Sequence, residues 1–287
     1  MGRVTTVEPA GRPGTDARSS EDAAASAGVT VRALASLDEL SRVDGLFAAV
    51  WGSTGQQVAM PVNLLRALIH SGSYVAGAFR GDDLVGAAVA FLGERHGEAE
   101  LHSHVAGVAR GWQGRGVGYA LKLHQRDWAV ARRIRWIEWT YDPLVRKNGF
   151  FNLVKLGARA VAYYPNFYGV MEDELNGSDE TDRCLIRWDV GGSPCTDVAR
   201  DRPDPQRVLT TGSDGAPVIE GPVRPGSDVP LLCQVPPDVV AMRRVDPELA
   251  GEWRLALRAT MGRAMEAGYV ATGMDRDGSY LLERPGR

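Results

Sequence analysis

The chain has 287 residues, and 33 Lys and Arg against 36 Asp and Glu give it a net charge of −3. This length fits one large domain or two small ones, and 44% apolar with 24% charged residues is the composition of a soluble globular protein. The near-zero charge argues against a general nucleic-acid binder, and no apolar run is long enough for a transmembrane helix.

The N-terminal segment and the cysteines carry little chemistry. Residues 1–28 contain no apolar run that could be a signal peptide and are rich in Gly, Ala, Ser and Pro, so we predict a disordered tail. Cys184, Cys195 and Cys233 are too few and too widely spaced for a disulfide scaffold or a zinc site. We therefore expect reduced thiols in a cytoplasmic protein.

Hydrophobic periodicity predicts the elements of residues 29–190. In chain order they are a strand at 29–34, helices at 36–50 and 62–70, strands at 73–80, 84–93 and 98–108, a helix after a Gly-rich loop at 111–118, a strand at 135–141, a short helix at 143–156 broken by Gly149, and strands at 158–164 and 181–190. This order is neither a strict βαβ alternation nor an all-β pattern. It predicts an α/β (α+β) fold in which helices flank a mixed sheet.

The composition changes at residue 191. Gly, Pro, Asp and Ser dominate residues 191–230, where two short apolar pieces predict a linker or a hairpin. In residues 231–287, a helix that opens at Asp246-Pro247 precedes two short strands. We expect this C-terminal accessory segment to pack on the main body, because it has too little apolar surface for a core of its own.

The sharpest motif is Gln113-Gly114-Arg115-Gly116-Val117-Gly118, which lies between a predicted strand and a predicted helix. Its glycines let the backbone turn sharply and present successive N–H groups, and the helix N-terminus adds positive potential, which together suit a phosphate. The motif lacks the Lys-Ser/Thr pair of a P-loop, and Tyr119 stands where a dinucleotide fingerprint needs its third Gly. What fits is Gln/Arg-x-x-Gly-x-Gly/Ala.

This loop, the Val-Ala-Gly-Val segment at 105–108 and the order of elements resemble the GCN5-related N-acetyltransferase (GNAT) superfamily over residues 29–190. The resemblance implies the GNAT acyl-CoA N-acyltransferase fold, with a mixed, mostly antiparallel sheet and a small C-terminal helix-hairpin appendage. Segments at 101–104, 139–144 and 164–169 are similar to a longer bacterial subgroup of predicted acetyltransferases. Some members of that subgroup look associated with amino-acid metabolism, where succinyl-CoA is a donor.

The resemblance also implies residues that bind acetyl-CoA or another acyl-CoA. The main chain of Gly107 and Val108 would pair with the pantetheine arm, and Asn148 or Asn152 would lie near it. The loop would hold the pyrophosphate through Gln113, Gly114, Arg115, Gly116, Val117 and Gly118, mainly by backbone N–H groups, with Arg115 adding charge. The chain departs from the family at Leu153, which stands where a Tyr usually protonates the leaving thiolate.

Acyl transfer to an amine needs a deprotonated amine, a stabilised oxyanion and a thiolate that is protonated or tolerated. His102 and His104 lie two apart on one predicted strand, so they share a face, and a histidine is a suitable base near neutral pH. The alternative for both is structural hydrogen bonding or surface exposure. A metal site is not expected, because no third ligand accompanies the two histidines.

Further candidate catalytic residues are Glu138, Asp142 and Tyr168. Glu138 and Asp142 lie on one face of the next strand, where Asp142 is either a base or amine-binding group or a cap for the following helix. Tyr168 is the candidate acid in an aromatic run that either walls a substrate pocket or packs in the core. Arg183 either holds a substrate carboxylate or forms a surface salt bridge.

These features predict an enzyme, an acyl-CoA-dependent N-acyltransferase with acetyl-CoA or succinyl-CoA as donor. It would transfer the acyl group directly to a primary amine of a small molecule, such as an amino acid or a specialised metabolite. The alternative is a non-catalytic acyl-CoA-binding sensor or interaction module, which the missing Tyr and the extra C-terminal segment favour. We expect no nucleic-acid or membrane partner, and the apolar accessory segment makes a homodimer reasonable.

Overall fold

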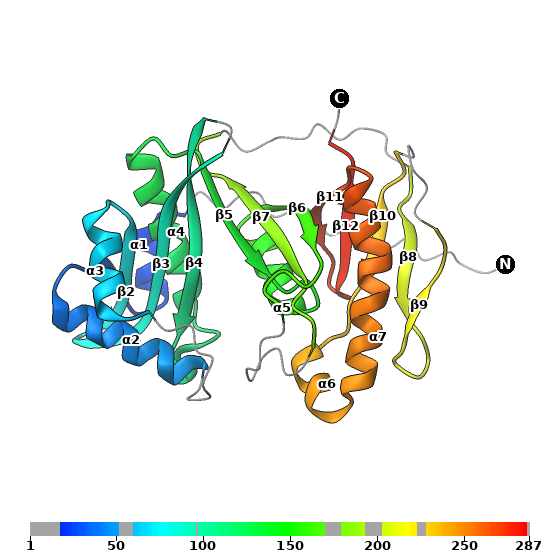
Figure 1. Cartoon of the computed structure of the whole chain (residues 1–287), viewed down its shortest axis with the longest axis horizontal. Helices are drawn as coiled ribbons and strands as arrows, with labels where there is room; N and C mark the ends of the chain where they lie inside the picture. The colour runs from blue at the N-terminus through cyan, green and yellow to red at the C-terminus, as the bar shows by residue number, and fades with distance from the viewer. Residues whose placement is uncertain are drawn as a thin grey trace.

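The computed structural model describes residues 18–51, 60–95, 97–169, 179–192, 203–222 and 228–285. Within these ranges one twelve-stranded sheet has the order β1-β2-β3-β4-β5-β7-β6-β11-β12-β10-β8-β9 (Figure 1). Neighbouring strands are antiparallel except for β4 with β5 and β8 with β10. The predicted fold class, a mixed and mostly antiparallel sheet with helices on its faces, is confirmed.

The elements up to residue 190 follow the predicted order, apart from one additional helix at the start. They are α1 (Ser20–Ser26), β1 (Thr30–Ala33), α2 (Leu37–Trp51), α3 (Val62–His70), β2 (Tyr74–Arg80), β3 (Asp83–Arg95), β4 (Glu98–Val108), a 3-10 turn (Arg110–Trp112), α4 (Val117–Ala131), β5 (Trp136–Tyr141), α5 (Arg146–Phe150), a π turn (Phe151–Lys155), β6 (Arg159–Tyr164) and β7 (Arg183–Asp189). Among the described helices, none is long and apolar enough to cross a membrane.

The additional helix corrects the prediction of a disordered tail over residues 1–28. The hydroxyl of Ser19 accepts a hydrogen bond from the backbone N–H of Asp22 at 3.0 Å and caps α1. Ala23, Ala24 and Ala27 are buried in the core cluster that includes α4. Three alanines give almost no hydrophobic signal in a sequence, yet their small side chains let a short helix pack closely. Residues 1–17 of the predicted tail lie outside the described residues.

Gly149 does not break its helix, contrary to the prediction. It lies inside α5, which continues directly into the π turn. A Cβ at this position would collide with the hydroxyl of Tyr280 and would lie 2.9 Å from Cε of Met274. The glycine is therefore explained by a close approach to the C-terminal strands.

The segment after residue 190 extends the same sheet. Its elements are β8 (Gln206–Thr211), β9 (Pro217–Ile219), β10 (Leu231–Gln234), α6 (Val239–Val245), α7 (Pro247–Leu257), a π turn (Arg258–Gly262), α8 (Arg263–Glu266), β11 (Val270–Met274) and β12 (Ser279–Glu283). Strands β8 and β9 form an antiparallel hairpin, and β11 joins β6 through the pair Ala271 and Ala160. The division of the chain at 28, 190 and 230 stays a prediction.

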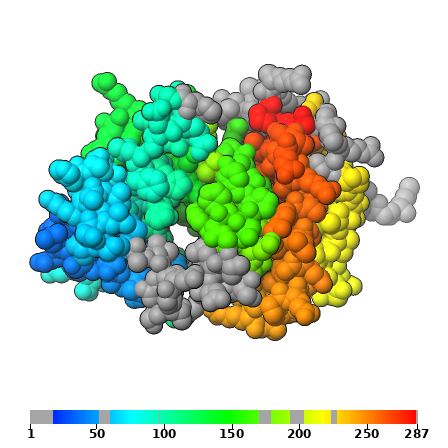
Figure 2. All heavy atoms as spheres, in the orientation of Figure 1, coloured from blue at the N-terminus to red at the C-terminus, as the bar shows by residue number. Residues whose placement is uncertain are grey.

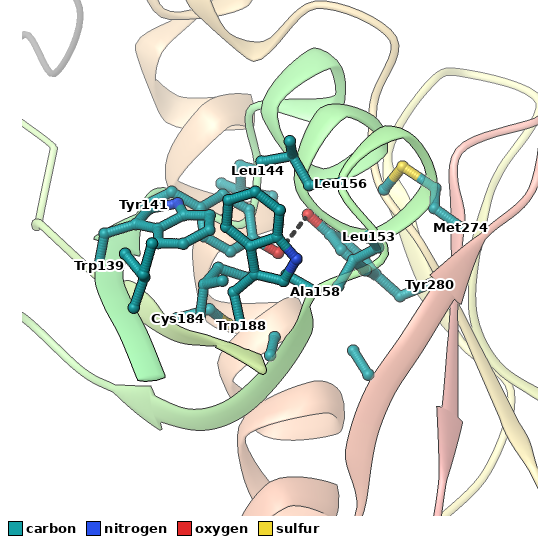
Figure 3. Packing of buried hydrophobic residues seen from close by; sticks show 14 of the residues in the cluster. Trp139, Tyr141, Leu144, Leu153, Leu156, Ala158, Cys184, Trp188, Met274 and Tyr280 are labelled. Atoms are coloured by element: carbon teal, nitrogen blue, oxygen red, sulfur yellow. Dashed lines mark hydrogen bonds between the residues drawn. The ribbon is translucent and has the colours of Figure 1, made fainter. Parts of the chain in front are cut away.

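Apolar side chains fill both faces of the sheet. On one face Leu40, Phe47 and Leu65 from α2 and α3 pack against β2 and β3. The larger cluster covers the other face around α1 and α4 and reaches into the C-terminal segment. Figure 3 shows its central part, where Tyr141 and Tyr280 meet with their hydroxyl oxygens 3.2 Å apart. The accessory segment and the main body therefore share one interior.

Candidate functional site

Strands β4 and β5 are parallel neighbours that separate part of the way along. They pair only from Glu100 with Trp136 to His102 with Glu138, after which β4 continues to Val108 and β5 to Tyr141. Figure 1 shows the two strands diverging, and Figure 2 shows a hollow between the two halves of the molecule. Beyond His102 and Glu138, the facing edges of β4 and β5 are therefore not paired with each other.

A bulge in β4 accompanies this split. Val105 and Ser103 pair with the consecutive residues Val89 and Ala90 of β3, so His104 is an extra residue in β4. An extra residue bends a strand and increases its twist, which turns β4 away from β5. Further along β4, a Cβ on Gly107 would lie 2.9 Å from the indole of Trp51, so only glycine lets α2 pack here.

The Gly-rich loop follows the open end of β4. The side-chain amide of Gln113 donates to the carbonyl of Val108 at 3.1 Å and so fixes the loop to the strand. Gly114 and Gly116 have φ of 77° and 89°, a left-handed conformation that side chains rarely adopt. Gly116 is the N-cap of α4 and has no side-chain cap, so the first N–H groups of this 15-residue helix face outward unpaired by the helix.

The predicted phosphate-binding residues lie in this loop with different surroundings. The side chain of Val117 is buried, and the guanidinium of Arg115 lies 5.1 Å from the ring of Trp112. A Cβ on Gly118 would have only Val108 within 4 Å, at 3.9 Å. The N–H groups of a helix start together with left-handed glycines form an anion cradle.

A cavity of about 620 Å³ opens beside the loop. Its lining includes Gly114 from the loop and a set of residues from α5, the π turn and the C-terminal segment: Arg146, Lys147, Asn148, Phe150, Phe151, Lys155, Pro237, Asp275 and Arg276. Four of these residues are cationic and one is acidic. The cavity therefore continues the anion cradle with positive charge, and predicted Asn148 is part of its wall.

Asn152 and Leu153 occupy the interior instead. The Asn152 amide oxygen accepts a hydrogen bond from the indole N–H of Trp139 at 3.3 Å, and both residues are buried. Leu153 packs among the apolar residues of Figure 3. The position where the resemblance leads one to expect a phenol therefore carries a buried aliphatic side chain.

The two histidines lie together on an aromatic surface. The ring centroids of His102 and His104 are 6.4 Å apart, and both rings contact Phe91, His102 in a stacked arrangement at 4.8 Å. Burial lowers the pKa of His104, and burial with the charge of His104 lowers that of His102. Both imidazoles are consequently neutral near pH 7, as a general base must be, and His104 is the more exposed.

Glu138 and Tyr168 have contrasting environments. Burial and the neighbouring Glu100 raise the pKa of Glu138, although its carboxylate is paired with Arg95 at 2.9 Å and Arg187 at 3.2 Å. Tyr168 is exposed, and its hydroxyl lies 3.0 Å from the hydroxyl of Thr140 on β5. Tyr168 thus contacts β5 beyond its last pair with β4, whereas Glu138 belongs to that last pair and is held by two arginines.

Asp142 belongs to a buried ion-pair cluster. Its carboxylate accepts hydrogen bonds from Arg254 at 2.8 and 2.9 Å, from Arg243 at 2.6 Å and from the backbone N–H of Leu144 at 2.9 Å. Burial alone would raise its pKa, but Arg254 and Arg243 hold that pKa well below the ordinary value. A carboxylate with these partners has little basicity, and the local bond to Leu144 resembles the capping alternative more than a base.

Lys122 on α4 was missed by sequence reasoning. Its ammonium donates to the hydroxyl of Ser103 at 2.8 Å and to the side-chain oxygen of Gln125 at 3.2 Å, and it lies 3.7 Å from the ring centre of Trp139. Burial lowers its pKa to about 7. Ser103 and Trp139 are the first residues beyond the last β4–β5 pair, so a buried lysine marks the point where the strands part.

The cations of the cavity were also missed. Arg146, Lys147 and Lys155 lie on a short amphipathic helix, where charged residues ordinarily face solvent, and Arg276 follows in sequence much later. No local pattern distinguishes them from a solvated surface. Among the described residues, no group of three or more His, Cys, Asp or Glu is arranged to hold a metal.

Comparisons with known proteins address the fold. No protein-family model and no curated protein matches the sequence. A GNAT-family acetyltransferase structure from Streptococcus pneumoniae is 13% identical with a TM-score of 0.46, over 55% of this chain and 98% of that one. Another, from Elizabethkingia anophelis with acetyl-CoA bound, is 16% identical with a TM-score of 0.41, over 56% of this chain and 98% of that one.

The core of this chain is similar to GNAT acetyltransferases. An aminoglycoside acetyltransferase from an uncultured soil metagenomic sample, solved with trehalose, is also similar, at 18% identity and a TM-score of 0.37 over 40% of this chain and 78% of that one. The likeness to GNAT acetyltransferases is one of fold. It does not extend to the narrower bacterial subgroup or to a substrate.

Proposed function

We propose that this chain is an acyl-CoA-dependent N-acyltransferase, which uses acetyl-CoA or succinyl-CoA to acylate a primary amine of a small molecule directly. The observation that carries the proposal is the junction of β4 with α4. An open strand edge leads through two left-handed glycines into an uncapped helix N-terminus. An extended chain that ends in phosphates fits such a junction, because the strand edge offers main-chain hydrogen bonds and the helix start binds the anion.

The donor side of the site fits acyl-CoA by charge and by size. Backbone N–H groups of the loop and the start of α4 would hold the pyrophosphate. The basic cavity next to Gly114 has a volume typical of small-molecule sites and would accommodate the nucleotide. The main chain of Gly107 and Val108 would meet the pantetheine arm, with Asn148 beside it.

The acceptor side would use the surface around His104. In direct transfer the amine nitrogen attacks the thioester carbonyl carbon, the C–S bond breaks, and the nitrogen loses a proton. His104 would take that proton, because it is neutral, exposed and located at the bulge that opens the split. Tyr168 would supply the proton for the thiolate. Asp142 has a structural role in this proposal, and Glu138 positions Arg95 and Arg187.

The decisive experiment measures both binding and turnover. Isothermal titration of the full chain with CoA should give a saturable heat, and acyl-CoA with a panel of amino acids and amines should release free CoA thiol. Comparison of acetyl-CoA with succinyl-CoA identifies the donor. Failure to bind CoA at millimolar concentration would refute the proposal.

Leu153 supports a second function, an acyl-CoA-binding sensor or interaction module. A buried leucine cannot protonate a thiolate, so the chain lacks the acid that the family usually has at this position. Tight CoA binding with no thiol release across the amine panel would favour the sensor. Turnover with any amine of the panel would exclude it.

A further inference from the structure

The turn between β11 and β12 forms a wall of the basic cavity. Asp275 and Arg276, which open this turn, line the cavity together with Pro237, and all three belong to the C-terminal segment. The same cavity is also lined by Gly114 of the Gly-rich loop. A segment outside the GNAT-like core therefore contributes to the candidate donor site.

The turn is held against α5 by several contacts. Arg146 of α5 donates a hydrogen bond to the carbonyl of Arg276. A Cβ on Gly278, whose φ is 92°, would lie 2.7 Å from the guanidinium nitrogen of Arg146, so the arginine packs directly on the turn. The backbone N–H of Ser279 donates to the carboxylate of Asp275 at 2.7 Å. Arg276 is thereby presented to the cavity by a fixed backbone.

Cations outnumber acidic groups in the wall of the cavity. Lys147, Lys155 and Arg276 have no ion pair within the described part of the chain, whereas Arg243, Arg254 and Arg258 of the C-terminal segment are each paired with a carboxylate. The one acidic group of the wall is Asp275, whose pKa is raised to about 6 by burial and by a hydrogen bond with Asp277. Three cations converging on one cavity indicate an anionic ligand.

We propose that Arg276 recognises the terminal phosphate monoester of the donor nucleotide, the 3′-phosphate of CoA, and that the adjacent Asp275 opposes it. This inference rests on the proposed function. The loop and the start of α4 offer N–H groups for the pyrophosphate, so the cations of the cavity lining remain for the second phosphate. Arg276 supplies a planar donor group that suits a phosphate dianion.

The test compares nucleotides that differ only in this phosphate. Titrations at pH 8, where Asp275 is ionised, use adenosine 3′,5′-bisphosphate against AMP and CoA against dephospho-CoA. Arg276→Gln should weaken binding of both 3′-phosphorylated ligands about ten-fold, the effect of losing one charge-assisted contact. Asp275→Asn, which keeps an acceptor for Ser279, should tighten them. Neither variant should alter binding of AMP or dephospho-CoA.

Arg244→Gln serves as the matched control, because Arg244 is an exposed cation of α6 outside the cavity lining. It should leave all four affinities unchanged. If the wild type transfers the acyl group, but the wild type and Arg276→Gln bind CoA with equal affinity, the inference is overturned and the proposed function stands. If Arg276→Gln weakens and Asp275→Asn tightens binding of the bisphosphate, but no acyl transfer occurs, the inference is supported and the proposed enzymatic activity is refuted. An equal loss with AMP or dephospho-CoA would show that Arg276 does not read the 3′-phosphate.

Discussion

The guanidinium of Arg254 donates two hydrogen bonds to the carboxylate of Asp142, at 2.8 and 2.9 Å, across 112 residues of sequence. Both side chains are buried, and Asp179 accepts a further bond from Arg254 at 2.8 Å. Asp142 lies at the end of β5, and Arg254 lies on α7. One ion pair therefore ties the end of the candidate site to the accessory segment.

Arg254→Met should lower the free energy of unfolding by about 3–5 kcal/mol, because it removes one of the two arginines that pair with the carboxylates of Asp142 and Asp179 in this cluster. Asp142→Asn should destabilise for the converse reason, and the double variant should cost less than the sum of the two. Urea unfolding monitored by circular dichroism measures all three.

The control is Arg135→Met, which removes a bidentate but exposed pair with Asp189 and should change stability little. Equal losses of unfolding free energy in Arg135→Met and Arg254→Met would show that burial of the Arg254 pair adds nothing to stability. A catalytic role for Asp142 would instead require Asp142→Asn to abolish turnover in protein that remains folded.

Lys122→Met should change how stability depends on pH. The pKa of Lys122 falls from an ordinary 10.5 to about 7 in the folded chain, so between these values only the unfolded chain binds the proton. Raising the pH through this window therefore favours the folded state, by about 1.4 kcal/mol per unit. The stability of the wild type minus that of Lys122→Met should rise from pH 7 to pH 10. A constant difference would show that the ammonium stays charged in the fold.

Gly149→Ala and Gly45→Ala should have opposite signs, although both lie in helices. At Gly149 the new methyl group would collide with Tyr280, and we expect a loss of about 1–3 kcal/mol from overpacking. At Gly45 in α2 nothing lies within 4 Å of the new Cβ, so alanine should stabilise by about 0.5–1 kcal/mol. Thermal and urea unfolding of both variants test the pair, and stabilisation at Gly149 would contradict the packing of α5 on β12.

Gly116→Ala should raise the KM for acyl-CoA about ten-fold with a smaller effect on kcat, because an alanine resists φ of 89° and the loop would distort. Gly111→Ala in the same connection is the control. Gly111 has no positive φ and no atom within 4 Å of the added Cβ, so its kinetics should match the wild type. Equal KM values for the wild type, Gly116→Ala and Gly111→Ala would show that this loop does not bind the donor.

The acidic limb of kcat/KM against pH should report His104. Burial lowers its pKa below the ordinary 6.5, so the rate constant should rise with pH below that value and level off above it, as the imidazole becomes neutral. His104→Gln should reduce kcat/KM about 100-fold or more and remove the limb. His102→Gln should keep the limb, and the reverse result would identify His102 as the base.

The sequence predicted the backbone of the core well and its long-range partners poorly. The bounds of α3 and β4 agree with the prediction to the residue, because regular periodicity reports a buried face directly. α1, β10 and α6 were missed, since elements of four to seven residues are too short to establish a period. Local order in this chain is encoded locally wherever the element is long.

The candidate site divides in the same way. The loop at 113–118 was evident from its glycines, whose positive φ is a local requirement. Asp142 was expected to be a base or a cap because nothing near it in sequence announces Arg243 or Arg254. The cavity cations were missed for a similar reason, since Arg276 and Lys155 line the same cavity only in the folded chain. A residue whose role depends on a partner distant in sequence cannot be identified from the residues next to it in the chain.

The single sheet that joins β6 to β11 also has a consequence for biosynthesis. The loop and α4 leave the ribosome long before the turn at Asp275 and Arg276, and a chain folds from its N-terminus as it is made. The nascent core must therefore wait with an incomplete cavity and an unpaired β6 edge. An exposed strand edge of this kind is a surface that chaperones bind.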